Sequence, residues 1–215
     1  MKLKAELKID EMIPHHIKKG RLSWSGFIMY WNDPADYYRQ YVLGLKKSAT
    51  DKMTAGSIFS KAFADRKYDY LMDIVKYRLR GRIADAIRNA LKVLPDIGKE
   101  NCEVEWIVPF YQLKLMGICD GYLEEHWHII ENKFSALKWT QEDVDRMWQI
   151  TFYSLIHLIK YGVPPSKITV NIINPTTGFV QSFQTKRTKQ QLLTFEPNVR
   201  YVIDGILAGS WEKKL

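Results

Sequence analysis

A block of strand-like sequence from residue 103 to residue 133 lies between helical regions and limits the folds open to this chain. Residues 103–115 alternate and are rich in Val, Ile, Phe and Tyr, which predicts strands. Residues 117–123 and 127–133 predict two more strands, joined by a short turn. A hairpin inside this block would bring residues from neighbouring strands to one place.

The sequence before this block is helical in character. Residues 23–42 open with the hydroxyl of Ser23, which is a good N-cap, and aromatic residues then recur at helical spacing. Pro34 should divide this region into two helices, because the residue before a proline disfavours helical geometry. Residues 54–65 and 68–94 predict further helices.

The sequence after the block returns to helix and then to strand. Thr140 begins a capping-box pattern that predicts one amphipathic helix running to about Tyr161. Two short strands over 168–173 and 179–183 form a predicted hairpin. The tail over 188–208 is mostly helical in pattern, with a break expected near Pro197.

These elements predict an α/β fold with a mixed central sheet flanked by helices and a helical N-terminal half. The chain has 215 residues, which suits a single domain over 1–215, and 46% of them are hydrophobic, enough for a sizeable core. We expect a helical part over about 20–98, a core over about 102–185 and a helical tail over about 188–210.

Charge and cysteine content limit the partners and the compartment. The net charge is +8, which favours anionic partners, with nucleic acid as the first candidate. Cys102 and Cys119 sit in apolar stretches and are expected to be buried free thiols, and two cysteines cannot supply the four thiolates that usually hold an iron–sulfur cluster. The first residues lack the apolar core of a signal peptide, and no apolar run approaches the length of a membrane span. We therefore expect an intracellular, cytoplasmic protein without a membrane partner.

Five residues of the second half form a candidate site. Glu131 and Lys133 are two apart and share one face of a predicted strand, and a hairpin can place Asp120 beside them. Gln149 and Tyr153 are four apart and share one face of the following helix. The carboxylates of Asp120 and Glu131 are the kind of ligand that Mg²⁺ prefers, so the pattern predicts metal-dependent phosphodiester hydrolysis.

The predicted roles follow from side-chain chemistry. Asp120 and Glu131 would bind the metal, and the backbone carbonyl of Asn132 could help because it lies beside Glu131. Lys133 could position or help to deprotonate the attacking water, or neutralise charge in the transition state. Gln149 and Tyr153 could orient a DNA phosphate or the Lys133 side chain.

The order of the motifs carries this prediction. Glu-x-Lys alone is uninformative, because it also occurs at Glu6–Lys8 and Glu212–Lys214. Gly-x-x-Asp and Gln-x-x-x-Tyr each occur once, on either side of the Glu-x-Lys in strand-like sequence. A surface hairpin with solvated charges is the alternative. The apolar residues that lead directly into Glu131 disfavour it, since a buried approach makes an unpaired charge costly.

These motifs resemble the RecB-like branch of the PD-(D/E)XK nuclease superfamily. The resemblance lies in Gly117–Asp120, Glu131–Lys133 and Gln149–Tyr153, with a looser match around Ser23-Trp24-Ser25, and it spans about residues 20–210. It implies a restriction-endonuclease-like core and Mg²⁺- or Mn²⁺-dependent DNA cleavage. The cleavage would be exonucleolytic, on DNA ends or single strands, in replication, recombination or repair. A helicase or a recombination protein is an expected partner, and no residue pattern indicates an oligomer interface.

The sequence departs from the family at two points. Ser60 stands where many RecB-like members carry a histidine ligand, so the metal would have fewer protein ligands unless Glu103 or Glu105 helps. The cysteines of the cluster-bearing members are absent, so the chain resembles the cluster-free type found in phage recombination and in standalone exonucleases. Ser60 also supports an alternative, a non-catalytic nucleic-acid-binding or recombination-scaffold protein with the nuclease fold. An endonuclease or junction resolvase on the same core is a third possibility.

Overall fold

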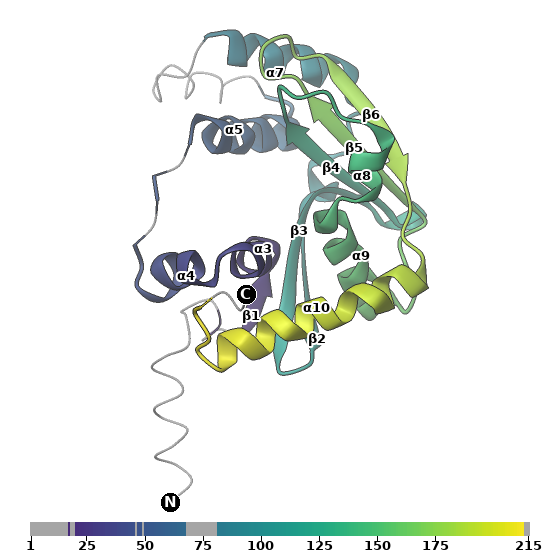
Figure 1. Cartoon of the computed structure of the whole chain (residues 1–215). Coiled ribbons are helices and arrows are strands. Elements are labelled where there is room, and N and C mark those ends of the chain that lie inside the picture. The colour runs from purple at the N-terminus through teal and green to yellow at the C-terminus, as the bar shows by residue number, and fades with distance from the viewer. Residues whose placement is uncertain (1–16, 18–19, 46, 49, 68–80, 213–215) are drawn as a thin grey trace, which may run out of the picture.

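The structure is a computed structural model, and it describes residues 17, 20–45, 47–48, 50–67 and 81–212. Residues 68–80, where the sequence predicts the start of a long helix, lie outside the described residues, as does the Glu6–Lys8 pair. The described residues form the predicted mixed α/β fold (Figure 1).

One mixed sheet is formed by the described strands β1 (Arg21–Ser23), β2 (Cys102–Phe110), β3 (Leu113–Leu123), β4 (His128–Phe134), β5 (Lys167–Ile173) and β6 (Val180–Thr185). Its spatial order is β1-β3-β4-β5-β6, and β2 pairs with β3 on the edge away from β1 and β4. β1 runs parallel to β3 and β4 runs parallel to β5, whereas the other pairs are antiparallel.

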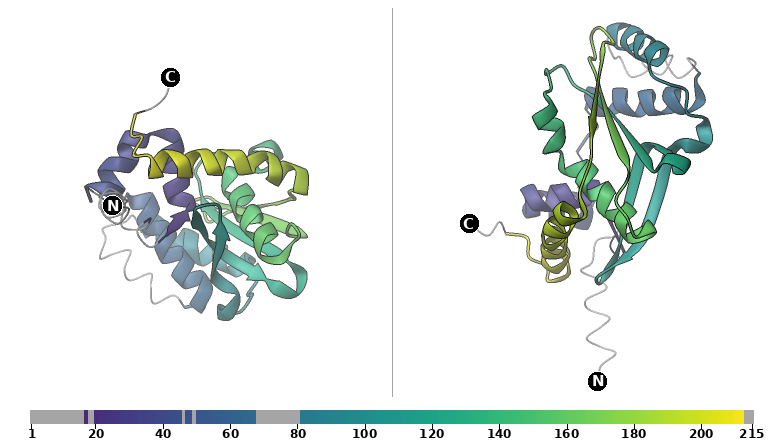
Figure 2. Two further views of the ribbon diagram at one scale, coloured as in Figure 1. Left: turned by 90° about the horizontal axis from the view of Figure 1, so that it is seen from below. Right: turned by 90° about the vertical axis from the view of Figure 1, so that its right-hand side faces the viewer.

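Helices lie on both sides of the sheet (Figure 2). The described helices are α3 (Trp24–Asn32), α4 (Pro34–Tyr37), α5 (Asp51–Asp65), α7 (Gly81–Val93), α8 (Gln141–Asp145), α9 (Trp148–Tyr161) and α10 (Lys189–Leu207), with single turns η1 (Tyr38–Val42), η3 (Lys99–Asn101) and η4 (Glu124–His126). Adjacent residues Ile172 and Ile173 of β5 belong to different apolar clusters, so the clusters lie on opposite faces of the sheet. The larger cluster contains residues of α3, α9 and α10, and the smaller contains residues of α5 and α7.

Side-chain caps set several helix starts as the sequence predicts. The Ser23 hydroxyl accepts a hydrogen bond from the Gly26 amide at the start of α3. Asp33 ends α3 and caps α4, which confirms the predicted division beside Pro34. Thr140 forms the predicted capping box of α8.

Two predicted strands are in fact one. The sequence predicts separate strands before and after Met116, but β3 runs without interruption from Leu113 to Leu123. Asp120 therefore lies inside a strand, three residues before its end. β2 pairs along β3 through Gly117, and this ladder holds the glycine in the strand.

The prediction of one continuous helix after Thr140 is wrong. It is divided into α8 and α9, because Met147 adopts an extended conformation with φ −68° and ψ 108°. The predicted break near Pro197 is also wrong, since α10 continues through this proline. Pro197 and Leu193 are both exposed, so water can satisfy the Leu193 carbonyl that the proline leaves without a backbone donor.

The cysteines are free thiols, with Cys119 buried and Cys102 only half-buried. Among the residues that the structure describes, no helix has both the length and the apolar character needed to cross a membrane.

Candidate active site

One edge of β3 has a stretch that pairs with neither β1 nor β4. β1 pairs with residues 114–116 and β4 pairs with residues 121–123 of this edge, because β2 occupies the opposite edge. Neither neighbour pairs with residues 117–120 on the open edge. Asp120 therefore borders a gap in the hydrogen-bond ladder, where a side chain can take the place of a backbone partner.

The alternation of side chains along β3 shifts at the same point. A Cβ on Gly117 would lie 2.9 Å from Ile156 Cδ1 of α9, and the Tyr122 hydroxyl lies 3.0 Å from His157 Nε2 of the same helix. Residues five apart in a regular strand face opposite sides, yet these two both meet α9. The side chains therefore change sides between Gly117 and Tyr122, in the segment that contains Asp120.

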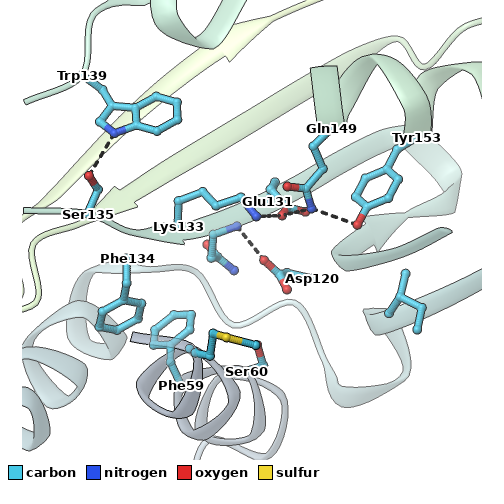
Figure 3. Close-up of a pocket in the computed structure, with 14 residues that line it drawn as sticks. Phe59, Ser60, Asp120, Glu131, Lys133, Phe134, Ser135, Trp139, Gln149 and Tyr153 are labelled. Carbon is cyan, nitrogen blue, oxygen red and sulfur yellow. Dashed lines mark hydrogen bonds and ion pairs between the residues drawn. The ribbon is translucent and has the colours of Figure 1, made fainter. Parts of the chain in front are cut away.

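A pocket of about 410 Å³ lies at this opening, and residues of α5, β3, β4 and α9 line it. All five residues of the predicted site line the pocket, namely Asp120, Glu131, Lys133, Gln149 and Tyr153 (Figure 3). The structure thus brings together residues from two strands and a helix, as the sequence predicts. Their catalytic and metal-binding roles stay predictions.

Glu131 is the centre of the polar contacts. Its Oε1 atom lies 2.5 Å from Lys133 Nζ and accepts a hydrogen bond from Gln149 Nε2 at 2.7 Å (Figure 3). The same Gln149 nitrogen lies 2.9 Å from the Tyr153 hydroxyl. Glu131 is only 2% exposed, and its Oε2 atom is buried without a hydrogen-bond partner among the described residues. A buried carboxylate oxygen without a donor is costly, so it fits a site that receives a cation.

Asp120 is held by the neighbouring strand. Its Oδ2 atom accepts a hydrogen bond from the backbone N–H of Asn132 at 2.7 Å. In a strand the N–H and C=O of one residue point to the same side, so the Asn132 carbonyl also faces the opening. This arrangement is compatible with the predicted carbonyl ligand.

The sequence analysis missed the support behind Asn132. The Asn171 amide on β5 donates to Asn132 Oδ1 at 2.9 Å, and the Ser182 hydroxyl on β6 donates to Asn171 Oδ1 at 2.7 Å. Asn171 is buried at 3% exposure between the apolar residues Val170 and Ile172 of β5. A lone amide in such a run is the signal that could have pointed to a polar network.

The charged groups of the pocket shift one another's pKa values. Burial and, to a smaller extent, the nearby Glu131 carboxylate raise the pKa of Asp120 to about 8, against the opposing charge of Lys133. Burial also raises the pKa of Glu131. For Lys133, burial lowers the pKa, but the carboxylates of Glu131 and Asp120 outweigh that effect and leave its pKa above the usual value. Lys133 is therefore an ammonium at neutral pH.

A divalent cation fits this charge pattern. Two carboxyl groups face one ammonium, and a cation would stabilise both in the ionised form. Within the described part of the chain, no group of three or more His, Cys, Asp and Glu side chains gathers to hold a metal. Mg²⁺ is often bound through only one or two carboxylates, with waters and substrate phosphates completing its shell, so two acids are a sufficient protein contribution.

Of the three residues considered as an additional metal ligand or its replacement, Ser60 lines the pocket and Glu103 and Glu105 do not. Ser60 of α5 lines the pocket across from Asp120 (Figure 3). Glu105 is exposed and forms an ion pair with Arg21 at 3.7 Å. Glu103 is exposed with a positive φ of 48°, and its charge contributes least among the causes that shift the pKa of Asp120. Neither glutamate lines the pocket.

Comparison with known proteins bears on the fold. No protein-family model matches the chain, and no curated protein matches it. Among solved structures, a protein from Eubacterium rectale named "Putative exonuclease" superposes with a TM-score of 0.66 at 16% sequence identity. The superposition covers 92% of this chain and 85% of that chain. At this identity the likeness shows a shared fold, and it confirms the predicted fold class.

Proposed function

We propose that this chain is a metal-dependent deoxyribonuclease of the cluster-free RecB-like type. The observation that carries the proposal is the convergence of Asp120, Glu131 and Lys133 in one pocket, where one oxygen of the buried glutamate has no partner among the described residues. The likeness to a structure named an exonuclease supports it independently of the motifs. We further propose that it acts on DNA ends or single strands in replication, recombination or repair, in a phage or its host cell.

Asp120 and Glu131 would hold Mg²⁺ or Mn²⁺, with the Asn132 carbonyl as a third oxygen donor. Such a cation lowers the pKa of a bound water and withdraws charge from a phosphoryl oxygen. Residues of the chain would orient the carboxylate that binds the cation. Gln149 bonds Glu131 Oε1 and so fixes the carboxylate, while Oε2 has no partner among the described residues and could bind the cation.

Lys133 has the role of a cation in this proposal. Its raised pKa keeps the proton on Nζ at neutral pH, which disfavours a general-base role. An ammonium of this kind can donate to a non-bridging phosphate oxygen and neutralise charge that develops in the transition state. Tyr153 holds Gln149 through its hydroxyl, and burial raises the pKa of this phenol, so it stays neutral.

The substrate and partners follow from charge and chemistry. A net charge of +8 favours a polyanion such as DNA. A helicase or recombination protein would supply the opened or resected ends, in the cytoplasm of the cell that contains the protein.

A second candidate function is a nucleic-acid-binding scaffold without catalysis. Ser60 supplies no imidazole to the pocket, and the described residues offer two carboxylates rather than three. A weak metal site would leave binding intact and abolish cleavage.

One assay separates these functions. Purified protein is incubated with end-labelled linear DNA and with covalently closed circular DNA, in Mg²⁺, Mn²⁺ or EDTA. Metal-dependent loss of the linear DNA alone indicates an exonuclease, and cutting of the circle indicates an endonuclease. DNA binding without cleavage of either substrate indicates a scaffold. Asp120→Asn should abolish cleavage, whereas the matched variant Glu105→Gln removes an acid outside the pocket and should cleave normally.

A further inference from the structure

Arg187 is a buried cation outside the pocket. It lies between β6 and Thr188, the N-cap of α10, and is only 5% exposed. Burying a guanidinium is costly unless its donors are satisfied, so its position calls for a physical reason. Within the described part of the chain, its hydrogen-bond partners are neutral oxygens rather than carboxylates.

Every N–H donor of Arg187 has a partner. Nε donates to Thr151 Oγ1 at 2.8 Å. Nη1 donates to Thr185 Oγ1 at 2.9 Å and to the Lys186 carbonyl at 2.8 Å. Nη2 donates to the carbonyls of Val144 and Met147 at 3.1 and 3.3 Å. A guanidinium has five N–H donors, so no donor is left for a phosphate and the role of Arg187 lies within the protein.

Three of these five contacts lie at the break between α8 and α9. Val144 belongs to α8, Met147 is the residue before α9, and Thr151 lies in the first turn of α9. Met147 makes no side-chain cap, so the start of α9 depends on contacts from elsewhere. Arg187 binds on both sides of Gln149, two residues before it and two residues after it.

We propose that Arg187 is a positioning residue that fixes the first turn of α9 and thereby holds Gln149 against Glu131. The inference rests on the proposed nuclease function. Gln149 approaches Glu131 at 2.7 Å, and a small rotation of the α9 start would break that contact. Displacements on this scale far from the chemistry can cost large factors in rate.

Steady-state kinetics of Arg187→Lys test the proposal. Lysine keeps the charge but has only three N–H donors, so it cannot bind the three carbonyls and two threonine hydroxyls together. We expect kcat to fall by about tenfold while KM stays within about twofold, because Arg187 does not touch substrate. In a Gln149→Ala background the same substitution should change kcat by less than about twofold, since its effect is transmitted through Gln149. Arg200→Lys, an exposed arginine paired with Glu196 on α10, is the matched control and should behave as wild type.

Equal losses in both backgrounds, or a rise in KM with unchanged kcat, would overturn the proposal. Should Arg187→Lys fail to fold, Thr151→Val removes one acceptor while keeping the β-branched shape, and it should lower kcat by about threefold with the same dependence on Gln149.

A second readout does not need activity. The Gln149 side-chain NH₂ signal in a ¹H–¹⁵N spectrum is assigned by its loss in Gln149→Ala. Arg187→Lys should shift or broaden this signal, and Arg200→Lys should leave it unchanged. An unmoved signal in Arg187→Lys overturns the positioning role. Absence of wild-type cleavage with a moved signal overturns the nuclease function alone.

Discussion

The backbone N–H of Asn132 on β4 donates to the Asp120 carboxylate on β3 at 2.7 Å, at the point where the two strands stop pairing. Regular pairing ends with Gly121 opposite Ile130, and a side chain then replaces the next backbone acceptor. The acid is thereby bound to the strand that carries Glu131 and Lys133. A gap in the ladder thus becomes the place where the acids of two strands meet.

Removal of the ammonium should abolish catalysis without unfolding the protein. We expect Lys133→Ala to lower Mg²⁺-dependent cleavage by about 10²-fold or more, because in the proposed mechanism this ammonium neutralises charge on the reacting phosphate. Circular dichroism should show an unchanged fold, since the Lys133 side chain is 30% exposed. Lys160→Ala, an exposed lysine of α9 beside Tyr161, is the control and should retain activity. Cleavage within about twofold of wild type in Lys133→Ala would contradict the assignment.

The metal-free protein should lose stability as pH rises from about 4 to about 8. The folded pKa of Asp120 is raised to about 8, above an unfolded value near 3.9, so the folded state holds a proton that the unfolded state releases in this range. The stabilisation is complete below the unfolded pKa and disappears as pH passes the folded pKa. Thermal unfolding in EDTA across this range measures it.

A bound cation should reverse this dependence. A cation bound by Asp120, as proposed, would displace the Asp120 proton. The Mg²⁺-induced rise in Tm should therefore be larger near pH 8.5, where the carboxyl is mostly ionised already, than near pH 6, where it is protonated. In Asp120→Asn the Mg²⁺ effect should be weak at every pH, and the decline in EDTA should be reduced. A Tm rise that is independent of pH in the wild-type protein would argue against Asp120 as the ligand.

Gly117 allows α9 to approach β3 closely. An added Cβ would lie 2.9 Å from Ile156 Cδ1 and 3.2 Å from the Tyr153 ring, inside a packed core. We expect Gly117→Ala to destabilise the protein by about 1–3 kcal/mol and to lower kcat, because the Tyr153 ring must shift and loosen Gln149. Urea unfolding and steady-state rates measure the two effects.

Gly56 provides the matched comparison for stability. It lies within α5, and a Cβ there would meet no atom of the described residues within 4 Å. Gly56→Ala should therefore stabilise the protein by about 0.5–1 kcal/mol through helix propensity. The opposite signs at the two glycines separate close packing from backbone preference, and a stabilised Gly117→Ala would show that the contact with α9 is not tight.

Local periodicity predicted which residues meet, because it depends only on nearby sequence. Glu131 and Lys133 share a strand face, and Gln149 and Tyr153 share a helix face, and both expectations agree with the observed contacts. The fold class followed from the order of helices and strands.

The features that the sequence did not predict depend on contacts between distant residues or on solvent exposure. The break before α9 is stabilised by Arg187, which lies 40 residues after Met147, so a local capping pattern could not indicate it. The opening beside Asp120 arises because β1, from the far N-terminal region, ends its pairing at Met116. The passage of α10 through Pro197 depends on solvent exposure, which the helical pattern alone did not reveal.

Ser60 offers a test of metal affinity. It faces the pocket from α5, opposite Asp120, at the position where the sequence resemblance implies a histidine (Figure 3). We expect Ser60→His to tighten Mn²⁺ binding, since imidazole is a good ligand for transition metals and a serine hydroxyl is not. Titration of Mn²⁺ by calorimetry measures the affinity directly, without reference to cleavage.

The control for this substitution is Ser57→His, which places an imidazole on an exposed residue of the same helix away from the pocket lining. It should leave Mn²⁺ affinity unchanged. Tighter binding in Ser60→His should vanish when Asp120→Asn is added, because one imidazole beside Glu131 alone is a poor site. Equal Mn²⁺ affinity in Ser60→His and wild type would mean that α5 does not reach the cation, and the metal would then depend on the two carboxylates and its own waters.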